Sequence, residues 1–339
     1  MNPWNSGPYQ GRNRNSRYFE GWYFKQTTRD RGEAWSVIPG IARGRRRGEG
    51  YSFVQVIEGR SGRSWWFDYP LSAFAASSSR LDITVGPSRF SSEGIRLRLE
   101  GPDGRIESDM RFGPLTGLPP RLLAPGVMGP YSFMPFMECS HGLVSLDHEV
   151  NGSLDIEDRR VDFDGGRGYA EKDWGRSMPS RWIWTQSNNF EDRGNSFMFS
   201  VARIPWLGGA FDGFLCAALL RDKPAIMASW TGAKLERLAL EDEEVEFSIV
   251  EGSTRVEARI SRTRGGILRA PVDGLLSRRI AESMDATLDL RWLEGDSTLF
   301  EGRAVGAGLE VVGDMAEAWD GNVQEGAKRN STPKPGGSK

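Results

Sequence analysis

The feature that most constrains the fold is the alternation of apolar and polar residues in short segments along the whole chain. A period of two is typical of β-strands, because successive side chains point to opposite faces of a sheet. One apolar and one polar face per strand fits antiparallel sheets that are buried on one side only. The pattern therefore predicts an all-β protein. It is clearest at residues 95–100, 245–249, 256–260 and 288–292.

Turn residues between the alternating segments indicate hairpins. They occur at 103–104, 151–152 and 251–253. At the second turn, a three-residue loop with a left-handed Gly152 pairs His148 with Leu154 and keeps the apolar residues on one face, so we predict that register.

Regular helices are expected at two places only. Apolar residues recur at helical spacing between Gly274 and Met284, and a short helical piece is predicted near Leu71 to Ala76. The segment 113–135 is rich in proline and glycine, which predicts a long ordered loop over the mouth of a barrel or between its strands.

The length of 339 residues exceeds the size at which a single hydrophobic core usually stops growing. We therefore predict two antiparallel β-barrel or sandwich halves packed together, with few short helices. The first half comprises residues 1–165 and the second comprises residues 166–321. Residues 322–339, rich in Gly, Asn, Lys, Ser and Pro, are predicted to form a disordered tail.

The charge balance argues against a nucleic-acid partner, because 44 basic residues nearly cancel 46 acidic ones. Basic residues cluster at 43–47, where a solvated loop is expected and contact with anionic lipid headgroups is the alternative. Cys139 and Cys216 form no CxxC pair, which fits a reducing compartment. Neither a secretory signal nor an apolar run of roughly 18 residues is visible. The expected location is cytoplasmic, with peripheral membrane contact left open.

Familiar catalytic signatures are absent from the sequence: it contains no GxSxG elbow, no GxxxxGK[ST] loop and no HExxH pair. The two histidines, His141 and His148, are an odd number of residues apart, so on one strand they would point to opposite faces and share no metal. Neither a metal nor a cofactor is expected. His148 lies among apolar residues, either as a core histidine or as a ligand contact.

Tryptophans, acids and amides concentrate in residues 168–190. As a strand, the later part places Trp182, Trp184, Gln186 and Asn188 on one face, which forms an aromatic wall ending in amides. Such a face suits a large apolar ligand with a few polar atoms. Plain core packing of the aromatic side chains is the alternative.

Carboxylic acids adjoin these aromatic residues. Glu171 and Asp173 share one strand face, and near the N-terminus Glu20 shares a face with Trp22. A carboxyl group among rings has a raised pKa and can donate a proton near neutral pH. Rings also stabilise a carbocation, by about 0.5–2 kcal/mol each. The pattern indicates machinery for protonating an alkene. The alternative is an ion-pair network of Glu171, Lys172 and Asp173 that holds the two halves together.

The same residues resemble the motifs of a known family. Phe19–Lys25, Gly168–Gly175 and Trp182–Asn188 are similar, in order and spacing, to motifs of the tocopherol cyclase family, and the resemblance spans roughly residues 16–320. It implies a lipocalin-like architecture in both halves, shared with carotenoid hydratases and decalin-forming cyclases. Plant members close a chromanol ring on a prenylated hydroquinone without a cofactor. A plastid location does not carry over, because no transit peptide is visible.

We therefore predict an isomerising cyclase that acts on a prenylated quinol or related terpenoid. Asp173 or Glu171 is the predicted proton donor, with Glu20 as the alternative acid, and Gln186 and Asn188 would bind ring hydroxyls. A non-catalytic carrier of an apolar isoprenoid and an isoprenoid hydratase are the competing hypotheses. No oligomeric state is predicted. The predicted ligand contacts are Trp22, Tyr23, Tyr169, Trp174, Trp182, Trp184, Gln186, Asn188 and His148.

Overall fold

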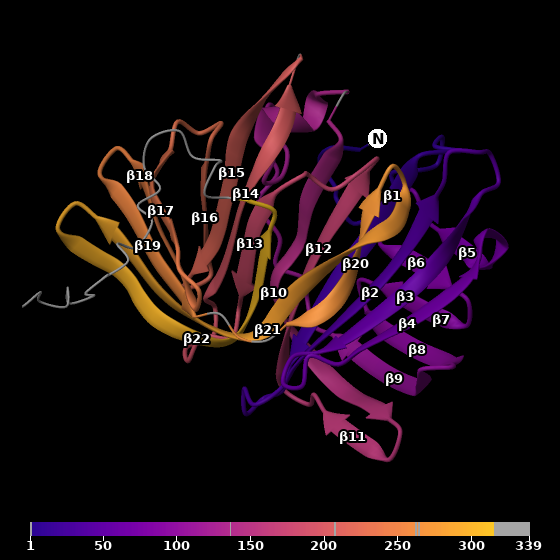
Figure 1. Cartoon of the computed structure of the whole chain (residues 1–339). Coiled ribbons are helices and arrows are strands. Elements are labelled where there is room, and N and C mark those ends of the chain that lie inside the picture. Colours follow the sequence, from indigo (N-terminus) through magenta and orange to yellow (C-terminus); the bar gives the residue numbers. More distant parts are fainter. Residues whose placement is uncertain (1, 136, 207, 262, 264, 315–339) are drawn as a thin grey trace, which may run out of the picture.

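The computed structural model describes residues 2–135, 137–206, 208–261, 263 and 265–314. This part of the chain folds into two antiparallel sheets, with two short 3₁₀ helices, η1 (Leu71–Ala73) and η2 (Gly129–Phe133). The prediction of an all-β protein built from two lipocalin-like halves is confirmed (Figure 1). No helix among the described residues is long and apolar enough to cross a membrane. The tail predicted at 322–339 lies outside the described residues.

The first sheet has twelve strands in the order β4-β3-β2-β1-β12-β10-β9-β8-β7-β6-β5, and β11 pairs with β10. Its strands are β1 Tyr18–Thr27, β2 Ala34–Arg43, β3 Gly50–Glu58, β4 Ser64–Pro70, β5 Phe74–Ala76, β6 Asp82–Val85, β7 Ser88–Ser91, β8 Gly94–Gly101, β9 Gly104–Phe112, β10 Cys139–Ile156, β11 Arg159–Asp162 and β12 Gly166–Gly175.

The second sheet has ten strands in the order β16-β15-β14-β13-β22-β21-β19-β18-β17, and β20 pairs with β21. Its strands are β13 Trp182–Ser187, β14 Ser196–Trp206, β15 Gly209–Leu220, β16 Lys223–Ala228, β17 Lys234–Leu240, β18 Glu244–Glu251, β19 Thr254–Ser261, β20 Gly266–Val272, β21 Leu275–Glu294 and β22 Ser297–Val312.

The chain passes from one sheet to the other between Gly175 and Trp182, because β12 pairs with β1 and β10 of the first sheet. The predicted division after residue 165 falls one strand before this crossing. Asp164 and Gly165 form the turn between β11 and β12, and Gly166 is the first residue of β12.

Each half has its own hydrophobic core, and a third apolar cluster lies between them. Trp22 and Phe24 belong to the first core, and Phe197 and Phe247 to the second. The third cluster combines side chains of both sheets, including Tyr23, Tyr169, Trp182, Trp184 and Met284. The period-two alternation explains this division, since Tyr23 points to the third cluster while its neighbours Trp22 and Phe24 point to the first core.

The hairpin predicted at Asn151-Gly152 is wrong. β10 continues through both residues: its first part pairs with β12 and its last part with β9. Gly152 has a φ of +124°, and a Cβ there would meet Asp109 O at 2.2 Å, so the glycine serves a bend within a continuous strand. His148 accordingly pairs with Gly168 and not with Leu154. The other two turns are confirmed, because Gly101 pairs with Gly104 and Glu251 with Thr254.

The helix predicted from Gly274 to Met284 is also wrong, because this segment begins the twenty-residue strand β21. Leu276 and Ile280 are buried, and their separation of four residues satisfies a helical period and a strand period equally. The short helical piece predicted near Leu71 to Ala76 is present in part: η1 covers Leu71–Ala73, and the strand β5 covers Phe74–Ala76. The proline-rich segment does form a long loop between β9 and β10, and this loop contains η2.

Candidate functional site

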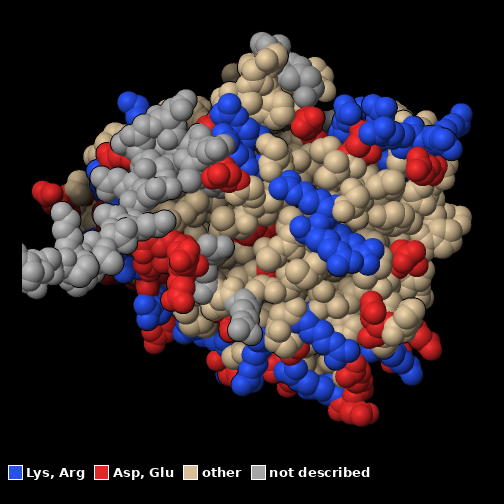
Figure 2. Space-filling model, in the orientation of Figure 1, with Lys and Arg blue, Asp and Glu red and all other residues tan. Residues whose placement is uncertain are grey.

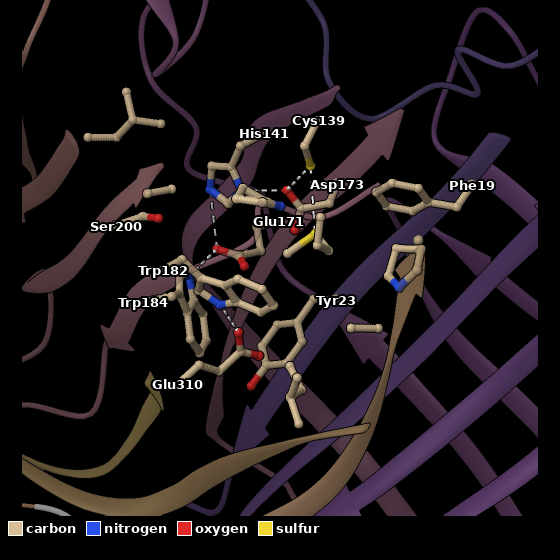
Figure 3. Close-up of a pocket in the computed structure, with 18 of the residues that line it drawn as sticks. Phe19, Tyr23, Cys139, His141, Glu171, Asp173, Trp182, Trp184, Ser200 and Glu310 are labelled. Atoms are coloured by element: carbon tan, nitrogen blue, oxygen red, sulfur yellow. Dashed lines mark hydrogen bonds and ion pairs between the residues drawn. The ribbon is translucent and has the colours of Figure 1, made fainter. Parts of the chain in front are cut away.

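A pocket lies between the two halves and is lined mainly by the third apolar cluster (Figure 3). Side chains from both sheets form its walls, and Met128, Tyr131 and Met137 of the long loop complete the lining. Its aromatic lining residues are Phe19, Tyr23, Phe53, Tyr131, Trp182, Trp184, Phe211 and Phe214. A mostly apolar cavity with a few polar groups is the usual form of a small-molecule site.

Strand pairing brings a histidine to the two predicted acids. His141 on β10 lies opposite Asp173 on β12, and Leu143 lies opposite Glu171. The imidazole Nδ1 is 2.9 Å from Asp173 Oδ1, and Nε2 is 3.6 Å from Glu171 Oε2. Because the two acids are two residues apart on one strand face, a single ring reaches both. Figure 3 shows this group on the wall of the pocket.

Glu171 is buried within this group. The Tyr169 hydroxyl and the Trp184 indole N–H, the latter at 3.2 Å, both donate to its Oε2. Burial raises the pKa of Glu171 to about 7, against the lowering effect of the nearby His141. In the described part of the chain no group bonds to Oε1. This oxygen can therefore carry a proton toward the pocket.

His141 is a cation at neutral pH. Burial alone would lower its pKa, but the carboxylates of Asp173 and Glu171 raise the pKa of His141 to about 9. The donor atoms of these three residues lie within 4.8 Å of one another, so they could also ligate a divalent cation. A metal would then compete with the protons on Glu171 and His141.

Two further carboxyl groups lie close to the pocket, of which Glu282 is fully buried and Glu310 half-buried. Glu310 on β22 lines it and accepts the Trp182 indole N–H at 2.5 Å, and Glu282 on β21 accepts the Tyr23 hydroxyl at 2.6 Å. Burial raises the pKa of Glu282 to about 7 and that of Glu310 well above its usual range. Carboxyl groups thus hold the polar ends of the central aromatic side chains, which fixes the rings facing the cavity.

Five of the predicted site residues line the pocket, namely Glu171, Asp173, Tyr23, Trp182 and Trp184. The sequence interpretation missed His141, Glu282 and Glu310. No local pattern identifies the two glutamates, because pairing with distant segments brings Glu310 to the pocket lining and Glu282 to the Tyr23 hydroxyl. His141 is one of only two histidines in the chain, which was the available signal.

Glu20, Trp22 and Trp174 lie outside the pocket, on the opposite face of β1 and β12. Lys172 Nζ is 2.7 Å from Glu20 Oε1, and both side chains are fully buried. The ammonium also stands over the rings of Trp22 and Trp174, 5.2 and 4.6 Å from their centroids. This group fixes the N-terminal segment, since Lys172 Nζ donates to Pro8 O and Trp22 Nε1 to Gly7 O. This pair lies within the first half, because β1 and β12 belong to the same sheet, so it does not join the two halves as the ion-pair alternative expected.

The predicted amides and Tyr169 also lie outside the pocket lining. Gln186 Oε1 accepts from Lys25 Nζ at 3.1 Å, and Asn188 Nδ2 donates to Asp147 Oδ1 at 2.9 Å. Gln186 continues the face of Trp182 and Trp184 as expected, but beyond the cavity this face enters a buried polar seam. The seam joins the halves, and neither Gln186 nor Asn188 is among the residues that line the pocket.

His148 belongs to the first half and does not line the pocket. Its ring is 4.5 Å from that of Phe112, and its Nδ1 is 3.0 Å from Ser145 Oγ. Burial lowers the pKa of His148 to about 3, so the ring is neutral. These surroundings are those of a histidine in the core of the first half, which was one of the two alternatives for His148.

Close packing behind Trp184 gives a direct test of the aromatic wall. A Cβ at Gly308 would lie 2.6 Å from the Trp184 ring, so Gly308→Ala is expected to displace the indole and to lower the free energy of unfolding by about 1–3 kcal/mol. Urea denaturation followed by tryptophan fluorescence measures the loss. Gly209→Ala is the matched control, because its nearest neighbour is 3.6 Å away. Equal stability of both variants would contradict the packing described.

The fold and the pocket define a class of two-part antiparallel β-protein with a mostly apolar pocket between its halves. Within this class, a family profile described as tocopherol cyclase-like matches residues 100–204, which include His141, Glu171, Asp173 and both pocket tryptophans of β13. The match confirms the resemblance to the tocopherol cyclase family and supports a cyclase-type function in broad terms. No curated protein matches the sequence.

Solved structures share the fold. CghA in complex with Sch210972 superposes with a TM-score of 0.53 at 10% identity, covering 88% of this chain and 89% of CghA. CghA alone gives a TM-score of 0.50 at 11% identity with the same coverage. A protein of Nitrosomonas europaea described as an AttH candidate gives 0.48 at 13% identity, covering 86% of this chain and 92% of its own. The CghA likenesses show the fold alone.

Proposed function

We propose that this protein is a cofactor-independent cyclase that closes an oxygen-containing ring on a prenylated quinol or related terpenoid. The observation that carries the proposal is Glu171, a buried carboxyl group with a pKa of about 7 and an unbonded Oε1, set in an aromatic pocket. A proton donor poised near neutral pH beside cation-stabilising rings is the apparatus that alkene protonation needs. The family match is in accord with this chemistry.

The proposed reaction begins when Glu171 Oε1 gives its proton to one alkene carbon. The tertiary cation that forms on the other carbon lies against Tyr23, Trp182 and Trp184, each ring contributing about 0.5–2 kcal/mol. A phenol oxygen of the substrate captures the cation and forms the C–O bond, and the phenolic proton returns to the Glu171 carboxylate. Proton count and mass are unchanged, so the reaction is an isomerisation.

His141 and Asp173 have supporting roles in this scheme. The imidazolium stands 3.6 Å from Glu171 Oε2 and stabilises the carboxylate left after proton donation. Asp173 bonds to the imidazole Nδ1 at 2.9 Å and fixes the ring in this orientation. The geometry therefore favours Glu171 over Asp173 as donor, with Asp173 as a positioning residue.

Incubation with a prenylated hydroquinone tests the proposal. We expect a chromanol of the same mass as the substrate, formed equally well in the presence of EDTA. Quenching of tryptophan fluorescence by the quinol without any product would identify a carrier. A product heavier by one water would identify a hydratase, and either outcome would overturn the proposal.

The pH dependence of turnover follows from the state of the donor. Glu171 must be protonated, so kcat is expected to be level below a pH of about 7 and to fall about tenfold per unit above it. Initial rates across the pH range, with the fold checked by circular dichroism at each value, measure the profile. A rate that rises through neutral pH would indicate a base and contradict the assignment.

A further inference from the structure

An exposed apolar patch lies on the loop that covers the pocket. Leu122 and Leu123 are 79% and 77% exposed, and Phe133 and Trp4 are 43% and 47% exposed. The Trp4 ring packs edge-on against Phe133 with 5.6 Å between centroids, and Trp4 Nε1 donates to Leu122 O at 3.3 Å. The N-terminal segment and the loop therefore form one surface, here called the apolar patch: Trp4, Leu122, Leu123 and Phe133.

The same loop has an apolar inner side that lines the pocket through Met128, Tyr131 and Met137. It is held in place by Trp230, whose Nε1 donates to Val127 O at 2.8 Å, and by the His141 N–H, which donates to Met128 Sδ at 3.0 Å. A single loop thus links the pocket wall to the apolar patch. Large exposed apolar side chains of this kind mark an interaction surface.

The two sequence segments that carry the apolar patch are basic. Residues 2–19 and 113–137 contain no Asp or Glu, but they contain Arg12, Arg14, Arg17 and Arg121. All four arginines are exposed. The patch and its flanks therefore combine apolar side chains with positive charge.

The basic loop 43–47 adds to this charge. The Arg17 N–H donates to Gly44 O at 2.7 Å, which places the loop beside the N-terminal segment. Arg17, Arg45 and Arg176 share one carboxylate, Asp273, at 3.8, 2.6 and 2.7 Å. Three guanidinium groups around one carboxylate leave an excess of positive charge. Figure 2 shows basic side chains along the upper edge of the molecule, with some acidic side chains among them.

We propose that this surface docks on an anionic lipid bilayer. The apolar patch enters the boundary between headgroups and acyl chains, and the arginines contact lipid phosphates. Tryptophan and phenylalanine suit this depth, because their rings are apolar and the indole N–H can meet a polar headgroup. The proposal is independent of the reaction in the pocket, and it gives an apolar ligand a route from the bilayer.

Flotation of the full chain with phosphatidylcholine vesicles, with and without phosphatidylglycerol, tests the proposal without any substrate. Binding is expected to the anionic vesicles and to weaken as salt is added. Absence of binding to the anionic vesicles, or equal binding to the neutral ones, would overturn it.

The double substitution Leu122→Ser with Leu123→Ser is expected to weaken binding to anionic vesicles at least about tenfold. Leu299→Ser is the matched control, because Leu299 is an exposed leucine, 45% accessible, on β22. Circular dichroism and thermal unfolding verify that both variants fold. Equal vesicle binding by the double variant and the control would refute the proposal. So would light scattering that shows a wild-type dimer dissociated by the double substitution, since the patch would then contact a second copy.

Discussion

Glu171→Gln is expected to lower kcat for ring closure by about 10²–10⁴-fold while leaving ligand affinity nearly unchanged. Glutamine has the same shape, and its amide oxygen can still accept from the Tyr169 hydroxyl and the Trp184 indole. It cannot give a proton to an alkene. Steady-state turnover of a prenylated hydroquinone measures kcat, and titration of tryptophan fluorescence measures affinity.

Asp173→Asn is the matched comparison, because it also replaces an acid by its amide on the same strand face. Asparagine can still accept from His141 Nδ1, so the expected loss in kcat is smaller, about tenfold, with the pH profile shifted as the charge beside His141 disappears. Full turnover by the Glu171 variant, with loss in the Asp173 variant, would assign the donor to Asp173 and contradict the account.

Lys172→Met is expected to cost about 3–5 kcal/mol of stability, because it leaves the fully buried Glu20 carboxylate without its counter-ion. The substitution also removes the bond from Nζ to Pro8 O, which holds the N-terminal segment. Combining it with Glu20→Gln removes the uncompensated charge and is expected to restore part of the loss. Urea denaturation of the single and double variants measures these differences as a thermodynamic cycle.

Arg63→Met provides the control for charge removal at the surface. Arg63 pairs with Glu157 at 2.6 Å, but about half of each side chain is exposed, so the expected change is below about 1 kcal/mol. Equal losses for the Lys172 and Arg63 variants would show that the pair of Lys172 and Glu20 does not brace the N-terminal segment.

The sequence predicts the strands well wherever one face is buried and the other is wet, as at residues 245–249 on β18. Prediction from the sequence fails where one local pattern is compatible with two different structures. Leu276 and Ile280 fit helix and strand periods alike, and pairing of this part of β21 with β20 decides for the strand. Asn151-Gly152 has the composition of a turn, but the pairing of β10 with β9 carries the strand through it.

The residues of the candidate site also fall into two groups, those that the sequence identifies and those that only strand pairing brings together. Motif and alternation identify Glu171, Asp173 and the pocket tryptophans, because these residues are neighbours in the sequence. Strand register brings the others: His141 lies opposite Asp173, and Glu310 lies opposite Trp184 on β13. Such pairings join segments far apart in the chain and leave no local trace.

The amides of Gln186 and Asn188 lie outside the pocket lining for a related reason. Gln186 lies on the face that alternation predicts, but alternation does not specify where the cavity ends along that face. Its bond to Lys25 places it in the polar seam between the halves.

Turnover of a prenylated hydroquinone in D₂O shows directly whether an enzyme proton adds to the alkene. If a carboxyl proton in exchange with solvent adds to the alkene, the chromanol carries one deuterium on the carbon that was protonated, as mass spectrometry and NMR would show. A chromanol formed in D₂O without deuterium at that carbon would contradict the account.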